Sequence, residues 1–262
     1  MNLSIVTVCY NAAKDLNITI ESIIQQTYKD FEYIIIDGDS KDETHTILDK
    51  AQKTFTQKGI KITIISEPDK GVYDAMNKAA QIASGDWINY MNAGDVYYSN
   101  TCLYDFFNKP FNDNIGYCYG DCIEIYKWGE LQLSKNKQIK KNHIMPFSHQ
   151  AAFVRVALMK QNPFNLQYKI VADYDLFYRL KQQGIKSEFR PVIICKFDAI
   201  HGLSANNPLQ LNLEKLKIHG IDKTYYYPIC VLKVYIRQGF IQPLKKILPD
   251  KFINAIMKYR RK

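Results

Sequence analysis

Long apolar runs are missing from this sequence of 262 residues. No segment approaches the roughly 18 uninterrupted apolar residues that a membrane-spanning helix needs, so we expect no transmembrane helix. No charged leader or cleavage site precedes the first strand-like run, Leu3–Cys9, and this predicts a cytoplasmic protein that no secretory signal exports. Internal repeats and low-complexity linkers are also absent, while 47% of the residues are hydrophobic, which is ample for a packed core.

Cysteines are few and widely spaced. One close pair, Cys118 and Cys122, has no second pair at the spacing of a zinc site. We therefore expect all the cysteines to be reduced packing residues. The six are Cys9, Cys102, Cys118, Cys122, Cys195 and Cys230.

A glycine-rich phosphate loop is absent as well. The first predicted strand ends in Tyr10 and Asn11, where a dinucleotide-binding or P-loop enzyme would carry a run of glycines. This absence argues against a dehydrogenase or a nucleotidyltransferase on a doubly wound sheet, which is the alternative kind of nucleotide-binding enzyme.

Acidic residues are scarce near the C-terminal end. Residues 223–262 contain ten Lys and Arg residues and a single acid, Asp250, whereas the rest of the chain is close to balanced and the formal net charge is +9. A nucleic-acid-binding module would spread its cations over a whole face, so we expect no nucleic-acid partner. The mixture of apolar and basic residues in this tail indicates either an interfacial segment on anionic lipid or an ordinary pair of terminal helices with a solvated basic end.

Strand and helix patterns alternate through the first hundred residues. Short β-rich runs are predicted at 3–9, 31–36, 60–65 and 86–91, and helical stripes at 15–26, 44–55 and 72–83. This order predicts right-handed crossovers and a mostly parallel sheet flanked by helices. The alternation is less regular from 111 to 204, where strands are expected at 116–126 and 189–197 and a helix at 173–182; the chain after 206 is expected to be helical.

Polar side chains follow all four of these early strands. Asn11, Asp37, Asp69 and Asp95 come shortly after the first, second, third and fourth strand. Because parallel α/β sheets bind ligands beyond the carboxyl ends of their strands, this edge is the predicted site.

Three pairs of segments together resemble the family 2 glycosyltransferases, which are inverting enzymes with the GT-A fold. The resemblance covers about 200 residues and is closest to the members that build bacterial surface polysaccharides, such as O-antigen and capsule. The segments read IVTVCYN at 5–11 with IIDGDSKD at 35–42, SEPDKGVYDAMNK at 66–78 with SGDWINYMNAGD at 84–95, and SHQAAFV at 148–154 with ADYDLFYR at 172–179.

The resemblance implies that the first strand ends bind the nucleotide of a nucleotide-sugar donor. Asp37 is expected to accept a hydrogen bond from the base, and a carboxylate suits the N3–H of uracil. Thr7 and Asn11 are expected to line the nucleoside. The alternative for Asp37 is that it shapes the turn or caps the following helix. The family usually has a proline where this chain has Cys9.

The resemblance also implies a Mn²⁺ or Mg²⁺ site, because the leaving diphosphate is anionic and these cations prefer oxygen ligands. Asp95 is the expected ligand, although the family has two or three aspartates where this chain reads Asn92-Ala93-Gly94-Asp95. Asn92 and Gly94 are expected to contact the donor. His201 lies where some relatives supply a further ligand; its alternative role is structural.

Asp173 matches the family's general base, the group that takes the proton from the acceptor hydroxyl. His149 and Gln150 are expected to approach the same site and to orient the donor phosphate or the acceptor. The alternative for Asp173 is that of an ordinary acid at a helix start, which is the role expected of Asp175.

Three further residues are expected to bind substrate. Asp74 and Asn77 lie three apart on one helix face, and together with Asp69 they are positioned to contact the ribose or the donor sugar. Solvated helix acids are the alternative.

The expected protein is therefore a GT-A-like α/β enzyme in three parts. Residues 1–110 are its nucleotide-sugar half, 111–205 its acceptor half and 206–262 a helical, basic tail. It is expected to move a hexose or N-acetylhexosamine from a UDP-sugar to a sugar on a polyprenyl diphosphate. This places it on the inner face of the cytoplasmic membrane, and a homo-oligomer is compatible with the sequence.

Overall fold

The computed structural model describes residues 2–126, 129–133, 144–200, 202–236 and 239. Its first half alternates strands and helices, as the sequence pattern predicts. The elements are β1 (Leu3–Cys9), α1 (Leu16–Ile24), β2 (Phe31–Asp37), α2 (Thr44–Gln57), β3 (Ile62–Ser66), α3 (Val72–Ile82) and β4 (Trp87–Tyr90). Strands β1, β2 and β4 are buried along their whole length, because helices cover both faces of the sheet.

The second half of the chain extends the same sheet. Its elements are β5 (Val96–Tyr97), α4 (Cys102–Phe107), β6 (Ile115–Tyr126), β7 (Gly129–Leu133), a 3₁₀ turn η1 (His149–Ala151), β8 (Ala152–Arg155), α5 (Val156–Gln161), α6 (Ala172–Gln182) and β9 (Lys186–Asp198). The strand order is β3-β2-β1-β4-β8-β6-β9-β5, with β7 paired to β6. Strands β3, β2, β1 and β4 are parallel to one another, whereas β8 is antiparallel to both β4 and β6. The parallel pairing predicted from the sequence thus holds for the first half, and the second half makes the sheet mixed.

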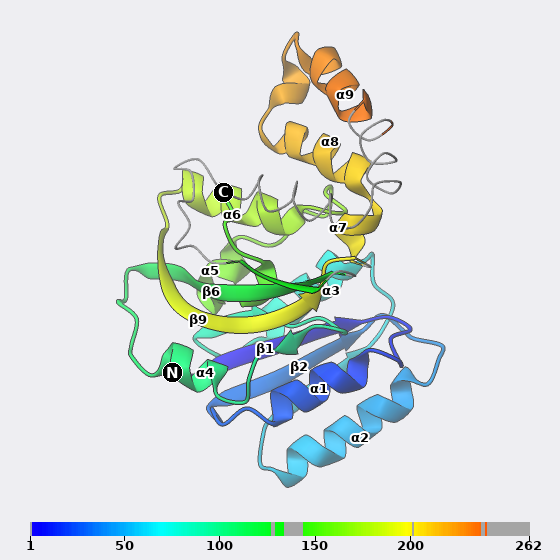
Figure 1. Cartoon of the computed structure of the whole chain (residues 1–262). Coiled ribbons are helices and arrows are strands. Elements are labelled where there is room, and N and C mark those ends of the chain that lie inside the picture. The colour runs from blue at the N-terminus through cyan, green and yellow to red at the C-terminus, as the bar shows by residue number, and fades with distance from the viewer. Residues whose placement is uncertain (1, 127–128, 134–143, 201, 237–238, 240–262) are drawn as a thin grey trace.

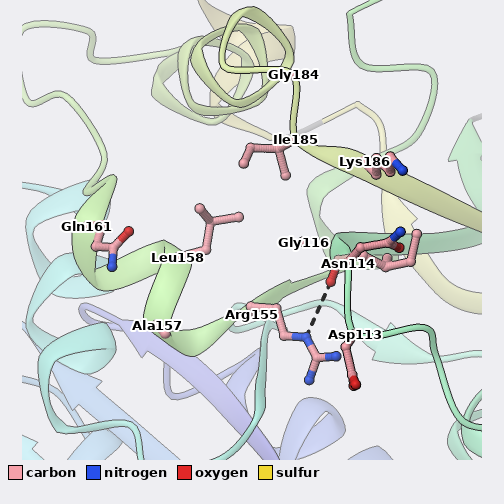
Figure 2. Close-up of a pocket in the computed structure, with 11 residues that line it drawn as sticks. Asp113, Asn114, Gly116, Arg155, Ala157, Leu158, Gln161, Gly184, Ile185 and Lys186 are labelled. Carbon is pink, nitrogen blue, oxygen red and sulfur yellow. Dashed lines mark hydrogen bonds between the residues drawn. The ribbon is translucent and has the colours of Figure 1, made fainter.

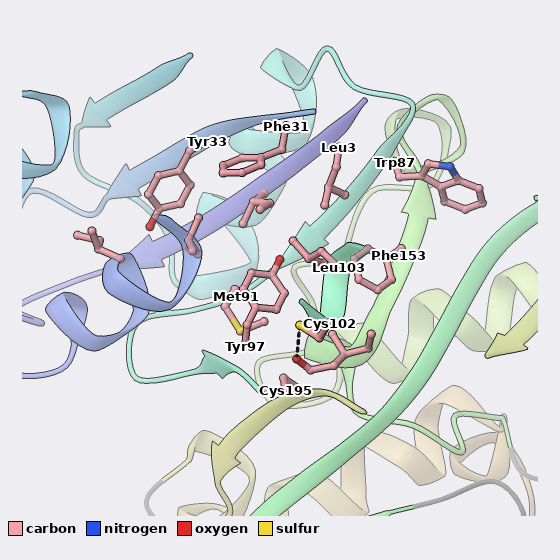
Figure 3. Packing of buried hydrophobic residues seen from close by; sticks show 14 of the residues in the cluster. Leu3, Phe31, Tyr33, Trp87, Met91, Tyr97, Cys102, Leu103, Phe153 and Cys195 are labelled. Atoms are coloured by element: carbon pink, nitrogen blue, oxygen red, sulfur yellow. Dashed lines mark hydrogen bonds between the residues drawn. The ribbon is translucent and has the colours of Figure 1, made fainter. Parts of the chain in front are cut away.

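Alternate side chains of the strands point to opposite faces of the sheet and pack into two apolar layers. Ile5 of β1 packs with α1, α2 and α4, and its neighbour Val6 packs with α3, α5 and α6. Figure 1 shows α1 and α2 below the sheet and α5 and α6 above it, with the long strands β6 and β9 curving across the molecule. Figure 3 shows the first layer, where Tyr97, Cys102 and Cys195 pack beside the strands. All six cysteines are free thiols, and all except Cys230 are buried.

The C-terminal helices stand beyond α6 in Figure 1. They are α7 (Leu203–Asn206), α8 (Pro208–Ile218), a 3₁₀ turn η2 (Ile221–Lys223) and α9 (Tyr227–Ile236). Ile218 of α8 packs against Ile170 and Val171, just before α6. Within the described ranges, no helix has the length and apolarity needed to cross a membrane. Most of the basic tail, 237–238 and 240–262, lies outside the described residues, as does His201.

Candidate active site

A tight turn carries Asp95 at the carboxyl edge of the sheet. Gly94 has a φ of +97°, which a residue with a side chain rarely adopts, and its amide donates to the Thr19 hydroxyl at 2.9 Å. The same hydroxyl donates to the Asp95 carbonyl oxygen at 2.8 Å. Helix α1 therefore fixes the turn, and the role of Gly94 in this structure is to shape it.

Asp95 is 9% exposed, and its carboxylate accepts a hydrogen bond from the Gln150 side-chain amide at 3.0 Å. Burial raises the pKa of Asp95 to about 6, against the opposing effects of His149, Gln150 and the Asn92 backbone. A cation beside this group would favour its ionised form, so the site suits a bound positive charge.

Asp173 lies in the first turn of α6 and faces His149 of η1. The Nδ1 atom of His149 is 3.5 Å from Asp173 Oδ2, and the two side chains are 25% and 19% exposed. The Tyr73 hydroxyl of α3 donates to Asp173 Oδ1 at 3.3 Å, and the Tyr174 amide donates to the same oxygen at 2.8 Å. Burial alone would raise the pKa of Asp173, but His149, Tyr174 and Tyr73 outweigh it and lower the pKa.

The two neighbouring aspartates affect the pKa of His149. Burial favours the neutral ring, whereas the carboxylates of Asp173 and Asp95 raise the pKa of His149. Consecutive residues of one 3₁₀ turn therefore bridge the two key carboxylates, with His149 on Asp173 and Gln150 on Asp95. The structure brings together four of the residues that the sequence singled out.

Oxygen ligands for a divalent cation are few at this edge. Asn92 Oδ1 is buried without a hydrogen-bond partner among the described atoms, and its Nδ2 lies 3.4 Å from the His149 ring. Asn92 and Asp95 thus offer two oxygen donors on one turn, which fits a cation whose other ligands are diphosphate oxygens and water. No group of three His, Cys, Asp or Glu residues at metal spacing occurs in the described part of the chain.

The structure gives Asp37 a different role from the expected one. Its side chain is fully buried at the end of β2. The Ser66 hydroxyl donates to it at 2.6 Å, the Ser40 amide at 3.2 Å and the Ser40 hydroxyl as well, while the His45 ring lies 4.0 Å away. These contacts match the alternative in which Asp37 shapes the turn, and they leave the base to another group.

The side chains of Thr7 and Asn11 also make hydrogen bonds within the protein. Thr7 is fully buried, donates to the Met91 carbonyl oxygen at 2.7 Å and accepts from the Tyr33 hydroxyl at 2.9 Å. Thr7 therefore lies inside the sheet and not along a nucleoside, which corrects the expectation. Asn11 is exposed at the edge, with a φ of +48°, and its Oδ1 accepts from the Lys41 amide at 2.8 Å.

A half-buried carboxylate, Asp69, lies over Gly38 in the turn after β2. A Cβ atom at Gly38 would be 2.6 Å from Asp69 Oδ2 and 3.3 Å from the ring of Tyr10. Asp69 Oδ1 accepts from the Gly71 amide at 2.7 Å, which fixes the carboxylate, and the Tyr10 ring is 63% exposed. An open aromatic face and a carboxylate oxygen thus lie side by side at the predicted nucleotide edge.

The two residues of α3 that were expected to bind substrate, Asp74 and Asn77, have structural contacts. Asp74 accepts from the Lys70 amide at 3.0 Å and so stabilises the helix start. Asn77 donates to the Phe164 carbonyl oxygen and accepts from the Phe164 amide, both at 2.9 Å. Asn77 therefore holds the loop before α6 through one N–H and one oxygen lone pair, and its contact with a sugar stays a prediction.

Two residues near Asp173 were not identified from the sequence. Tyr73 contacts Asp173 directly, and Glu214 of α8 binds the segment that precedes it. Tyr73 belongs to the SEPDKGVYD segment, so its place in this motif could have identified it as a candidate site residue. Glu214 lies in α8, a helix with no motif, and only the tertiary structure shows that its side chain is buried.

A separate pocket of about 480 Å³ lies at the opposite edge of the sheet (Figure 2). Arg155, which pairs with the first residue of β4, lines it together with Gly116 and Lys186 at the starts of β6 and β9. The Arg155 Nε donates to the Ile115 carbonyl oxygen at 3.3 Å. None of the predicted site residues lines this pocket.

The sequence is similar to that of known glycosyltransferases. The family model described as "Glycosyl transferase family 2" matches residues 4–166, which is more than half of the chain. A PGL/p-HBAD biosynthesis glycosyltransferase of Mycobacterium tuberculosis is 31% identical over 209 residues, covering 77% of this chain and 78% of that protein. An uncharacterized glycosyltransferase of the same species is 26% identical over 204 residues, covering 75% of this chain and 74% of that one.

Solved structures with the same fold share less sequence. S. aureus TarS 1-349 aligns with a TM-score of 0.64 at 16% identity and covers 83% of this chain; this chain spans only 64% of that one. The mannosyltransferase PcManGT from Pyrobaculum calidifontis has a TM-score of 0.64 at 14% identity, covering 90% of this chain and 69% of the other. These likenesses confirm the GT-A-like α/β fold expected from the sequence. The chain belongs to glycosyl transferase family 2 and is a glycosyltransferase.

Proposed function

We propose that this glycosyltransferase moves a hexose or an N-acetylhexosamine from a UDP-sugar to a hydroxyl of a lipid-linked sugar, with inversion. The observation that supports the chemistry is the η1 bridge, in which His149 holds Asp173 and Gln150 holds Asp95. The pKa of Asp173 is lowered and that of Asp95 is raised. Two carboxylates with different pKa values can have different roles, here Asp173 as the proton acceptor and Asp95 as the cation ligand.

Asp173 is the general base in this mechanism. Its lowered pKa keeps it ionised at neutral pH, so it can accept the proton of the acceptor hydroxyl as that oxygen attacks the anomeric carbon. The bond from the anomeric carbon to the diphosphate oxygen breaks as the new bond forms on the opposite face. An α-linked donor therefore gives a β-linked product. His149 and Tyr73 orient the carboxylate of Asp173.

Asp95, with the Asn92 side chain, would hold Mn²⁺ or Mg²⁺. Such a cation supplies positive charge to the departing diphosphate. The structural relative PcManGT was solved in complex with GDP-Man and Mn²⁺. His201 stays a candidate ligand outside the described residues.

Recognition of the base is assigned to the surface at Tyr10 and Asp69 in place of Asp37. A base stacked on the exposed Tyr10 ring can donate its ring N–H to Asp69, and Gly38 leaves room for the carboxylate. TarS structures contain UDP and UDP-GlcNAc, whereas PcManGT contains GDP-Man, so relatives of this fold use more than one base. A uracil N3–H is a single donor, which suits one unoccupied carboxylate oxygen.

The acceptor and the location of the enzyme are proposed from the tail. A polyprenyl-diphosphate sugar lies in the membrane, so an enzyme that uses it must reach the inner face of the cytoplasmic membrane. The ten cations of residues 223–262 and the exposed apolar residues of α9 support docking on anionic lipid.

Thermal unfolding with UDP tests the donor and the metal together. We expect UDP with Mn²⁺ to stabilise the protein by about 2.7 kcal/mol at 100 times the Kd, and Asp95→Ala to remove the metal-dependent part. A panel of nucleotide sugars, scored for slow hydrolysis to free diphosphate, then identifies the donor. Equal stabilisation by UDP with and without metal would remove the role given to Asp95, and stabilisation by single-stranded DNA alone would favour a nucleic-acid partner.

A further inference from the structure

A buried carboxylate on α8 lies outside the site described so far. Glu214 is 6% exposed, although glutamate is seldom buried without partners. Its Oε1 accepts from the Lys169 amide at 3.0 Å and from the Gln210 side chain at 2.8 Å. Its Oε2 accepts from the amides of Ile170 at 2.9 Å and Val171 at 3.2 Å. Three consecutive backbone amides therefore converge on one charged group, an arrangement in which each hydrogen bond is charge-assisted.

These three amides belong to the segment that leads into the general base. Residues 169–171 end two positions before Asp173, and Val171 is the N-cap residue that directly precedes α6. The Tyr73 hydroxyl shares its one proton between the Ile170 carbonyl oxygen at 2.9 Å and Asp173 Oδ1 at 3.3 Å. Helix α8 thus holds the amide side of the segment while α3 holds its carbonyl side.

The next residue of α8 also lies close to the base. The ammonium of Lys215 is 4.7 Å from the centroid of the Tyr174 ring, one residue after Asp173. Burial lowers the pKa of Lys215, and the charge of Asp173 acts in the opposite direction. Helix α8 therefore flanks the acceptor side of the site and does more than cover the core.

We propose that Glu214 is a positioning residue for Asp173, so that the C-terminal helix α8 completes the catalytic apparatus. The inference rests on the proposed role of Asp173 as general base. Without the Glu214 charge, the 169–171 amides lose their common acceptor, and the first turn of α6 shifts relative to His149 and Tyr73. A displacement of about 1 Å at a reacting group costs up to about 100-fold in rate.

Glu214→Gln tests this directly, because the amide keeps the size of the side chain and removes its charge. We expect kcat for glycosyl transfer to fall about 10- to 100-fold while the donor KM and the UDP Kd stay within about twofold. Hydrogen–deuterium exchange of the peptide containing residues 169–171 should become faster. If Glu214→Gln does not fold, Glu214→Asp retains the charge at a shorter reach, and the same split between kcat and KM is expected with a smaller loss.

Glu32→Gln is the matched control. Glu32 is 3% exposed and also accepts several hydrogen bonds, but it lies at the opposite edge of the sheet. The Glu32→Gln substitution should lower the stability of the protein and leave kcat unchanged. A Glu214→Gln variant with wild-type kcat, or with kcat and UDP affinity falling in proportion, overturns the positioning role. If the wild-type protein transfers no sugar, the proposed function fails, and the exchange of 169–171 in Glu214→Gln still decides whether Glu214 holds this segment.

Discussion

At the scale of single residues, the site separates three aspartates by their surroundings. Asp173 is ionised beside His149, Asp95 has its pKa raised to about 6 by burial, and Asp37 is enclosed by hydroxyl and amide donors. A carboxylate whose lone pairs are taken by the protein cannot also bind a substrate. Only the first two of these side chains are therefore suited to chemistry.

Asp173→Asn should reduce glycosyl transfer more than any other near-isosteric change. The amide keeps the size of the carboxylate but cannot accept the hydroxyl proton, and general-base catalysis contributes about 10²- to 10⁴-fold. We expect kcat to fall by about that factor while UDP binding, measured by calorimetry, stays near the wild-type value. A variant that keeps most of its transferase rate would refute the assignment.

Asp175→Asn is the internal control for this experiment. Asp175 lies in the first turn of α6, as the sequence predicts, is 6% exposed and pairs with Arg179 at 2.8 Å. We expect its loss to lower the unfolding temperature and to leave most of the transfer rate. Equal rate losses at both positions would leave the base unassigned between them.

Asp69→Asn and Asp37→Asn should separate binding from stability. Asp69 Oδ2 accepts no hydrogen bond from the described residues, so Asp69→Asn should weaken UDP binding about 10-fold, with little change in unfolding temperature. Asp37→Asn should instead lower the unfolding temperature, because it breaks the contacts with Ser40 and Ser66. Unchanged UDP affinity in Asp69→Asn would place the base elsewhere.

The sequence predicted the residues of this site better than their roles. Asp95, His149, Gln150 and Asp173 lie together as the motifs indicate. Thr7 was misassigned because a motif does not show which face of a buried strand a side chain occupies. Hydrogen bonds between distant segments decide the rest, and neither spacing nor periodicity contains that information.

At the scale of elements, β2 carries a buried acid at each end. Asp37 joins the carboxyl ends of β1, β2 and β3, and Glu32 joins their amino ends. Glu32 accepts from the Ser4 hydroxyl at 2.7 Å, the Lys61 ammonium at 2.6 Å and the Ser84 amide at 2.6 Å. Burial would raise the pKa of Glu32, but these donors outweigh it and lower the pKa to about 2.

Acid should therefore destabilise the protein partly through Glu32. Its folded pKa of about 2 lies below the reference value of 4.5, so its contribution is complete above pH 4.5 and is lost as the pH falls toward 2. The shift corresponds to about 3 kcal/mol of unfolding free energy. Denaturation of Glu32→Gln at pH 7 and pH 3 should show a smaller pH dependence than the wild type. Glu67→Gln, at an exposed position, is the control and should show the same pH dependence of stability as the wild type. The prediction is contradicted if Glu32→Gln also shows the wild-type pH dependence.

Elements were predictable where one pattern dominates. The strands and helices of residues 3–83 follow from apolar runs and helical stripes, and the structure has them within a few residues. The short strand β8 and turn η1 were not predicted as elements, because four and three residues are too few for a period to appear. Their conformation depends on pairing with β4 and β6, so the antiparallel part of the sheet emerges only from tertiary structure.

At the scale of the whole molecule, helix α9 near the C-terminal end of the described chain carries exposed apolar side chains. Helix α9 has no buried residue, and Ile229, Leu232 and Ile236 are 57%, 59% and 47% exposed. Their spacing of three and four residues puts them on one helix face. Figure 1 shows α9 on the far side of the molecule from α1 and α2. A membrane bound through α9 would therefore leave the opposite side of the sheet in water.

Ile229→Ser combined with Leu232→Ser should weaken binding to vesicles that contain phosphatidylglycerol. Each aliphatic side chain contributes about 1.5 kcal/mol or more when it leaves water, so two of them correspond to about 100-fold in partitioning. Flotation should show the intact protein with anionic vesicles and much less with neutral phosphatidylcholine, because Lys223 and Lys233 add attraction to the acidic lipid. Ile18→Ser is the control, since Ile18 is 49% exposed on α1 and should not touch the membrane. Donor hydrolysis should be unchanged in all variants, because the site at η1 lies in another part of the fold. If the double variant floats as well as the intact protein, α9 does not dock on lipid, and its exposed face is only the outer surface of a terminal helix.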